Sequence, residues 1–140
     1  MISPETPRIR LGLFQGYGTA GNMEAVRANL AMLQDVAKKA AGYGVHLLSF
    51  PELYLSGYDV TDADTAHKLA EDIQREGILE LVAATSKAND LAIVCPYPEA
   101  ATVAGARRYY DSIAVYGRNG ESLKNYRKTH LWGGDERNNW

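Results

Sequence analysis

A single cysteine, Cys95, is present among the 140 residues, so no disulfide can form within the chain. Cysteine this scarce favours a reducing compartment. Basic stretches are equally scarce, because the formal net charge at pH 7 is −2 and adjacent basic residues occur only as isolated pairs. The sequence therefore excludes the basic surface that nucleic-acid binding requires and the polybasic segment that binds anionic membranes.

Long apolar runs are also missing. No stretch approaches the roughly 18 apolar residues of a transmembrane helix. The polar opening residues, which include Pro4 and Pro7, differ from the apolar core of a secretory signal. We therefore expect a cytoplasmic protein with no membrane partner. Residues 1–7 are expected to form a disordered lead and residues 8–140 one α/β domain, whose 46% hydrophobic and 23% charged composition is ordinary for that class.

Hydrophobic patterns in the first part of the chain predict strands that alternate with helices. Apolar runs or alternation predict three strands, over residues 8–15, 45–50 and 91–95. Apolar residues at three- and four-residue steps follow Asn22, a good helix cap, and predict a helix that ends near residue 41. A second helix is expected over residues 66–89, with a break near Gly77.

The later part of the chain predicts further strands. Asn119-Gly120 is a strong turn signal and predicts a hairpin of residues 109–116 and 121–126. Pro96 is expected to end the third strand, residues 100–105 to form a loop, and residues 127–140 to hold no regular element. The order strand, helix, strand, helix and three strands predicts an α/β layer with a mixed sheet.

Glu52 is a candidate general base because it directly follows a strand that is expected to be buried. Groups at the carboxyl ends of strands line the ligand crevice of an α/β sheet. A carboxylate that is partly desolvated there has the raised pKa that a general base needs. From position alone, a solvated loop glutamate is the alternative.

Lys128 also follows the end of a predicted strand, beside Arg127 and His130. Next to a carboxylate, a lysine stays charged and can stabilise an oxyanion. From position alone, an ordinary surface lysine is the alternative.

Two segments that contain these residues resemble the nitrilase superfamily of carbon–nitrogen hydrolases. Phe50 to Tyr58 (FPELYLSGY) is similar to the segment around that family's catalytic glutamate, and Asn125 to Leu131 (NYRKTHL) is similar to the segment around its catalytic lysine. Both occur in the family's order, and each follows a predicted strand. The resemblance extends over Arg8 to Trp140.

This resemblance implies the N-terminal part of a four-layer α-β-β-α sandwich and hydrolysis of a non-peptide C–N bond in a small amide, nitrile or carbamoyl compound. In that mechanism a cysteine thiolate attacks the substrate carbon, Glu52 is the general base and Lys128 stabilises the tetrahedral intermediate. The resemblance implies no metal and no organic cofactor, and it implies a homo-oligomer in the full-length form.

Three further residues are candidates through the same resemblance. Some family members carry a second glutamate shortly after the lysine, and Glu136 is the best match, with Asp135 as a near rival. Tyr58 and Trp132 are candidates for substrate binding, although ordinary packing is the alternative for each.

The family's nucleophilic cysteine follows both motifs in a Cys-Tyr-Asp segment, which the 140 residues do not contain. Cys95 precedes Lys128 and ends an apolar strand, where a thiol is expected to be an inert core residue. We therefore expect the nucleophile to lie beyond this chain and the chain alone to be inactive. A catalytically inactive homologue that acts as a binding or interaction module is the alternative.

A third possibility rests on the segment Gly16 to Gly21. Its glycines follow the Gly-x-Gly-x-x-Gly pattern, after a predicted strand and before a predicted helix, as dinucleotide binding requires. However, Glu52 is the only acidic residue at the end of the next strand, and the hydrolase motif explains it better.

Overall fold

The computed structural model describes residues 8–60 and 62–140, so the lead expected at residues 1–7 lies outside the described part. Helices and strands follow one another in the order β1 (Leu11–Leu13), α1 (Met23–Gly42), β2 (Leu47–Ser49), α2 (Ala63–Arg75), α3 (Ile78–Asn89), β3 (Ala92–Val103), β4 (Ala106–Tyr116), β5 (Ser122–Arg127) and α4 (Gly133–Asn139). None of these helices is long and apolar enough to cross a membrane.

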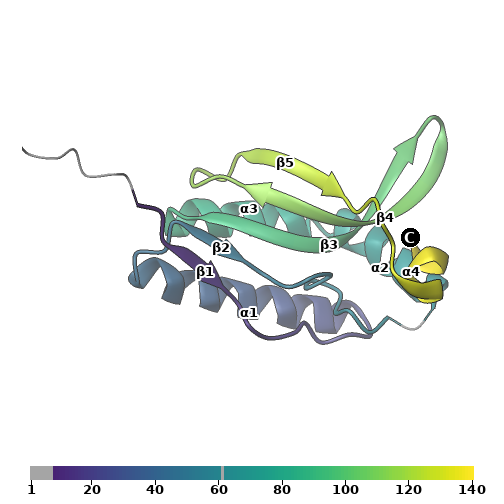
Figure 1. The fold of residues 1–140 in the computed structure, drawn as a ribbon, viewed down its shortest axis with the longest axis horizontal. Coiled ribbons are helices and arrows are strands. Elements are labelled where there is room, and N and C mark those ends of the chain that lie inside the picture. Colours follow the sequence, from purple (N-terminus) through teal and green to yellow (C-terminus); the bar gives the residue numbers. More distant parts are fainter. Residues whose placement is uncertain (1–7, 61) are drawn as a thin grey trace, which may run out of the picture.

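The strands form one mixed sheet in the order β1-β2-β3-β4-β5 (Figure 1). The first three strands are parallel, because the helices α1 to α3 make the crossovers between them, and β4 and β5 are added as antiparallel hairpins. The predicted mixed α/β sheet is confirmed.

Local signals in the sequence set the helix boundaries. The side chain of Asn22 accepts a hydrogen bond from the backbone N–H of Ala25, as expected of an N-cap, and Asp62 does the same for Thr65. The predicted break in the second helix is present, because Gly77 adopts a left-handed conformation with φ of 66° between α2 and α3.

The prediction that Pro96 ends the third strand is wrong, and so is the loop expected at residues 100–105. Strand β3 continues to Val103 and turns at Ala104-Gly105 into β4, which forms the hairpin that projects beyond the other strands in Figure 1. The parallel pairing with β2 stops at Val94. Beyond that point no strand of residues 8–60 or 62–140 pairs with this edge of β3, so a missing proline N–H costs no ladder hydrogen bond.

Side-chain alternation gives the sheet two different faces. The covered face packs against α1, α2 and α3, and its core includes Val26, Leu48, Val82, Ile93 and Cys95, each at most 2% exposed. The open face carries apolar side chains that no helix of the described residues covers. Its members, which we call the open face throughout, are Leu11, Leu13, Leu47, Val94, Ile113 and Tyr126.

Leu47 and Ile93 lie on opposite faces of the sheet although both are apolar. Leu47 lies on the open face, whereas Ile93 pairs with Leu48 and is fully buried on the covered face. Neighbouring residues of a strand point to opposite faces, and the register decides which of them faces the helices.

Candidate active site

Glu52 and Lys128 lie beside each other at the end of the sheet where β2 and β5 both finish, although β3 and β4 separate these two strands. Glu52 follows β2 after Phe50-Pro51, and the turn that follows it contains Leu53 with a positive φ of 49°. Lys128 follows β5, and its backbone N–H donates to the carbonyl of Asp111 at 2.9 Å, which continues the pairing of β5 with β4. Two residues 76 positions apart are thereby brought into contact.

The Lys128 ammonium is held by two carboxylates. Its Nζ donates to Glu52 Oε1 at 2.6 Å and to Glu136 Oε2 at 2.8 Å. Burial pulls the pKa of Lys128 down, but hydrogen bonds from Nζ to Glu136 and Glu52, with the charges of both, outweigh it and hold that pKa above its usual value. Lys128 is therefore a cation throughout the physiological pH range.

Glu136 is buried and accepts three hydrogen bonds. The donors are Lys128 Nζ at 2.8 Å, the hydroxyl of Tyr58 at 2.8 Å and the backbone N–H of Trp132 at 2.6 Å. Burial raises the pKa of Glu136, but these three donors overcome it, and the net pKa lies below its usual value. The rival residue Asp135 is exposed. Helix α4, which the sequence did not predict, turns Glu136 inward and leaves its neighbour outside.

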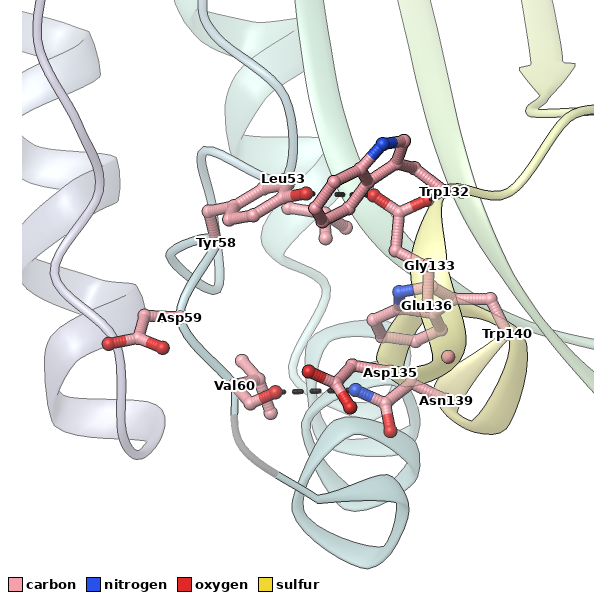
Figure 2. A pocket seen from close by; sticks show the side chains of 11 residues that line it. Leu53, Tyr58, Asp59, Val60, Trp132, Gly133, Asp135, Glu136, Asn139 and Trp140 are labelled. Atoms are coloured by element: carbon pink, nitrogen blue, oxygen red, sulfur yellow. Dashed lines mark hydrogen bonds between the residues drawn. The ribbon is translucent and has the colours of Figure 1, made fainter.

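Tyr58 and Trp132 both reach the site, but in different ways. The Tyr58 ring is 50% exposed, and its bond to Glu136, followed by burial, raises the pKa of its hydroxyl. Trp132 contributes its backbone N–H, while its indole is 78% exposed. Together with α4 they line a cavity of about 220 Å³ (Figure 2).

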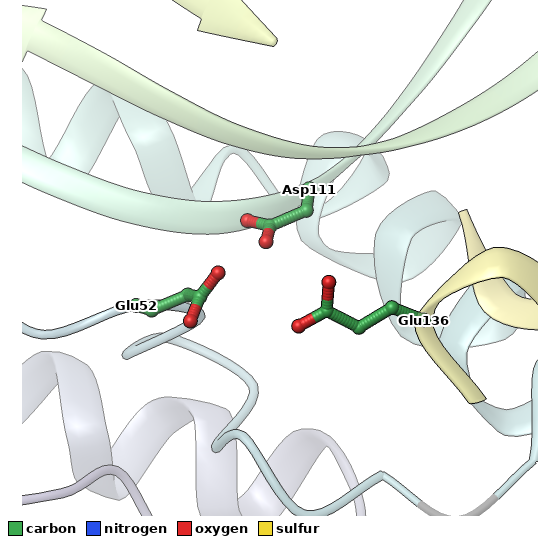
Figure 3. A group of neighbouring side chains, drawn as sticks. All are labelled: Glu52, Asp111 and Glu136. Atoms are coloured by element: carbon green, nitrogen blue, oxygen red, sulfur yellow. The ribbon is translucent and has the colours of Figure 1, made fainter. Parts of the chain in front are cut away.

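Asp111 is a fourth ionisable residue of the site, and it was not among the residues predicted from the sequence. It lies on β4, is 4% exposed, and points toward the same space as Glu52 and Glu136 (Figure 3). Its Oδ2 is 3.7 Å from Lys128 Nζ, which is too long for a hydrogen bond. The alternating residues Asp111, Ile113 and Val115 share one face of β4, so a lone carboxylate in an apolar row was the signal that could have found it.

By distance alone the carboxyl groups of Glu52, Asp111 and Glu136 could hold a metal ion, since one oxygen from each lies within 4.8 Å of the others. The Lys128 ammonium, however, is 2.6, 3.7 and 2.8 Å from oxygens of these three groups. It takes the place that a cation would occupy, so the donor set fits lysine better than a divalent ion.

A second cavity, of about 270 Å³, opens on the open face beside Glu52, Lys128 and Asp111. Most of its lining is apolar, and the remaining residues around it are Ser49, Phe50, Val94, Pro96, Ile113 and Tyr126. Cys95 is not among them, because it is fully buried on the covered face of β3, where burial raises the pKa of its thiol.

The glycine segment Gly16 to Gly21 packs closely against the loop that follows Glu52. A Cβ on Gly18 would lie 1.9 Å from the carbonyl oxygen of Tyr54. The backbone N–H and carbonyl of Thr19 are both bonded to the Asn29 side chain. Close packing therefore explains why residue 18 is a glycine. A phosphate-binding loop presents its backbone N–H groups to the ligand. In this segment the N–H of Thr19 is already bonded to Asn29, which argues against the dinucleotide-binding interpretation.

Comparisons with known proteins show what this chain resembles in sequence and in fold. A family model described as carbon-nitrogen hydrolase matches residues 11–139. A hydrolase encoded in the pqqF 5' region of Pseudomonas protegens is 37% identical over 108 residues, which are 77% of this chain and 35% of that protein.

Similar solved structures include an amidase from Nesterenkonia sp. AN1, with 22% identity, a TM-score of 0.76, and coverage of 95% of this chain and 49% of that one. A double mutant of that amidase in complex with acrylamide has 21% identity, a TM-score of 0.77, and coverage of 100% and 50%. This chain spans about half the length of these solved chains and 35% of the curated relative. It has a nitrilase-like fold over part of their length, and it belongs to the carbon-nitrogen hydrolase family.

Proposed function

We propose that residues 8–140 form part of an amidase that hydrolyses the C–N bond of small amides, with Glu52 as general base and Lys128 as the electrostatic stabiliser. The observation that carries the proposal is the Lys128 ammonium held between Glu52 and Glu136 at 2.6 and 2.8 Å. A lysine ammonium has three N–H donors, and these two contacts use two of them. The third donor is available for the oxygen of a substrate.

The two glutamates are suited to different tasks. Glu136 is 6% exposed and already accepts three hydrogen bonds, so it is fixed as an anion that orients Lys128. The Glu52 side chain is 42% exposed, lines the cavity on the open face and bonds Lys128 through Oε1. Of the two glutamates, Glu52 is therefore the one that is placed to exchange protons with a group in that cavity.

We propose that the nucleophile is a cysteine outside these 140 residues, because Cys95 lies on the covered face, away from the cavity. The thiol proton moves to Glu52, and the sulfur attacks the amide carbonyl carbon while the C=O electrons move to oxygen, beside Lys128. The tetrahedral intermediate collapses, nitrogen takes the proton from Glu52 and leaves as ammonia, and an acyl-enzyme remains. Water gives a proton to Glu52 and attacks the thioester carbon; the C–S bond then breaks, the acid is released, and the sulfur takes the proton back from Glu52.

The cavity lining favours short aliphatic amides as substrates. Phe50, Val94, Pro96 and Ile113 provide apolar contacts, while Glu52, Asp111 and Lys128 supply polar groups for an amide. Solved structures of the similar Nesterenkonia amidase hold acrylamide in one case and butyramide in another, which supports this size and class.

Ammonia release from acetamide, acrylamide and butyramide tests the proposal, using the protein purified from its source so that any continuation of the chain is present. Intact mass comes first, because a mass well above 15.4 kDa identifies a longer chain that can carry the missing cysteine. We expect Glu52→Gln to lower kcat/KM by about 10²–10⁴-fold and Lys128→Ala by about 10²–10³-fold or more.

Matched controls are Glu24→Gln and Lys38→Ala on the exposed side of α1, which should leave the rate unchanged. Full activity of either site variant would contradict the assigned roles. A native mass of 15.4 kDa with amide binding but no turnover would favour the alternative, a binding module without catalysis.

A further inference from the structure

We propose that Asp111 is a positioning residue of this site and that it retains a proton up to about neutral pH, through which it holds Glu52 against Lys128. The inference rests on the proposed function, because it concerns the same general base and the same lysine. Asp111 is 4% exposed, and its Oδ2 has no hydrogen-bond partner among the described residues. A buried ionised oxygen in that state is strongly unfavourable, whereas a neutral carboxyl is tolerated.

The charges around Asp111 give the same answer. Its titratable neighbours are Glu52 after β2, Lys128 after β5 and Glu136 on α4, and oxygens of the three carboxyl groups lie within 4.8 Å of one another (Figure 3). The one ammonium is already bonded to Glu52 and Glu136 and stands 3.7 Å from Asp111. Three carboxylates around one ammonium would leave two uncompensated negative charges, and a proton on one group removes one of them.

Asp111 is the group that keeps this proton. Glu136 accepts three donors and is fixed as an anion, and Glu52 is the most exposed of the three. The pKa of Asp111 is raised to about 7. Burial is the largest cause, followed by a hydrogen bond with Glu52 and by the negative charge of that carboxylate, whereas the positive charge of Lys128 lowers the pKa. A hydrogen bond between two carboxyl groups needs one proton, which Asp111 donates to Glu52.

Asp111 also holds Lys128 from its backbone. Its carbonyl accepts the Lys128 N–H at 2.9 Å, so one residue of β4 determines where both the base and the ammonium stand. Ionisation of Asp111 would place a further negative charge where the substrate oxyanion develops. In the proposed enzyme, kcat/KM therefore falls above pH about 7, and Asp111→Asn removes that alkaline limb.

Carbon-13 NMR of aspartate carboxyl groups tests the inference without measuring turnover. We expect one aspartate of the wild-type protein to titrate with a midpoint near pH 7 and that titration to be absent from Asp111→Asn. The exposed Asp135→Asn is the control and should retain it. If Asp111→Asn does not fold, the carboxyl resonance of Asp111 can be assigned in the wild-type protein itself, by through-bond NMR correlation with the backbone resonances of that residue. The titration midpoint of Asp111 is then measured without the variant.

Thermal unfolding supplies a second readout with a definite sign. A native carboxyl with a raised pKa stabilises the fold below the unfolded pKa of about 3.9 and loses that contribution as pH rises toward 7. The Tm of Asp111→Asn should therefore rise relative to the wild-type Tm as pH increases from about 4 to about 7, and the difference should be constant above that range. An Asp111 that titrates below pH 5, a Tm difference that does not change with pH, or an alkaline limb that persists in Asp111→Asn would overturn the inference. Failure to hydrolyse amides would overturn only the proposed function.

Discussion

Replacing Glu136 with alanine should detach α4 from the protein. The helix has seven residues, no side-chain cap, and only Glu136 and Asn139 as buried residues. Its position therefore depends on polar contacts. Alanine removes the acceptor of the Lys128 ammonium and of the Trp132 N–H, each a hydrogen bond to a charged group that contributes about 1.5–3 kcal/mol. The half-exposed Tyr58 hydroxyl can turn to water, so we expect a total loss of about 3 kcal/mol from α4 docking.

The two tryptophans make this loss observable, because Trp132 and Trp140 flank α4 and are the only tryptophans in the chain. Urea unfolding should be followed by tryptophan fluorescence and by far-UV circular dichroism. In the wild type the two transitions should coincide at pH 7. In Glu136→Ala the fluorescence transition should move to lower urea than the dichroism transition, because a peripheral helix can unfold locally while the sheet persists.

The contribution of Glu136 to stability should depend on pH. The native pKa of Glu136 is lowered, so its contribution is present above the unfolded pKa of about 4.3 and is lost as pH falls through the native value. Glu136→Gln, which keeps the shape and one acceptor oxygen, should cost about 1–2 kcal/mol at pH 7 and less toward pH 3. Coincident transitions in Glu136→Ala, or a Glu136→Gln deficit that grows toward acid pH, would refute this account of α4.

Three further changes have outcomes that follow from packing. In a urea titration, Gly18→Ala should lower the unfolding free energy by more than about 2 kcal/mol, because the added Cβ would lie 1.9 Å from the Tyr54 carbonyl oxygen. The control Gly42→Ala should be neutral or stabilising, because a Cβ there meets nothing within 4 Å. Cys95→Ala should leave amide hydrolysis within about twofold of wild type, and a loss above tenfold would contradict its assignment to the core. Tyr58→Phe should cost about 1 kcal/mol or less in stability, and a larger loss would show that its exposed ring contributes more than one hydrogen bond.

Glu52 and Lys128 could be found from the sequence because each is local to a recognisable segment. Each follows a strand, and strand ends are where ligand groups gather in an α/β sheet. Their mutual contact could not be expected from position, because β3 and β4 lie between the strands that the two residues follow. The sequence left Asp135 as a rival to Glu136 for the second glutamate of the family, because the orientation of α4 decides which of the two side chains faces the site. Helix α4 contains two glycines and polar residues and has no apolar periodicity, so the sequence did not predict it.

The missed features depend on neighbours that are distant in sequence. A proline such as Pro96 ordinarily interrupts a strand, but in the described part of the chain no strand pairs with the edge of β3 that Pro96 affects. Asp111 shows no motif, and its significance arises only when Glu52 and Glu136 are placed near it. The pattern of residues along a strand predicts which side chains share a face of the sheet. The charges that surround a side chain can be predicted only when the register between the strands is known as well.

The bulge between Val115 and Tyr116 has a consequence for how this chain can vary. It sets the register in which Ser112 pairs with Arg127. Arg127 thereby points to the covered face, where it binds Glu99 at 2.7 Å, and Lys128 points to the open face. A shift of one residue would exchange the two cations, and the planar guanidinium would replace a compact ammonium between the carboxylates. A single-residue deletion in the turn at residues 117–120 should therefore be harmful, although the turn is far from the site, whereas a two-residue change would conserve the facing of both side chains.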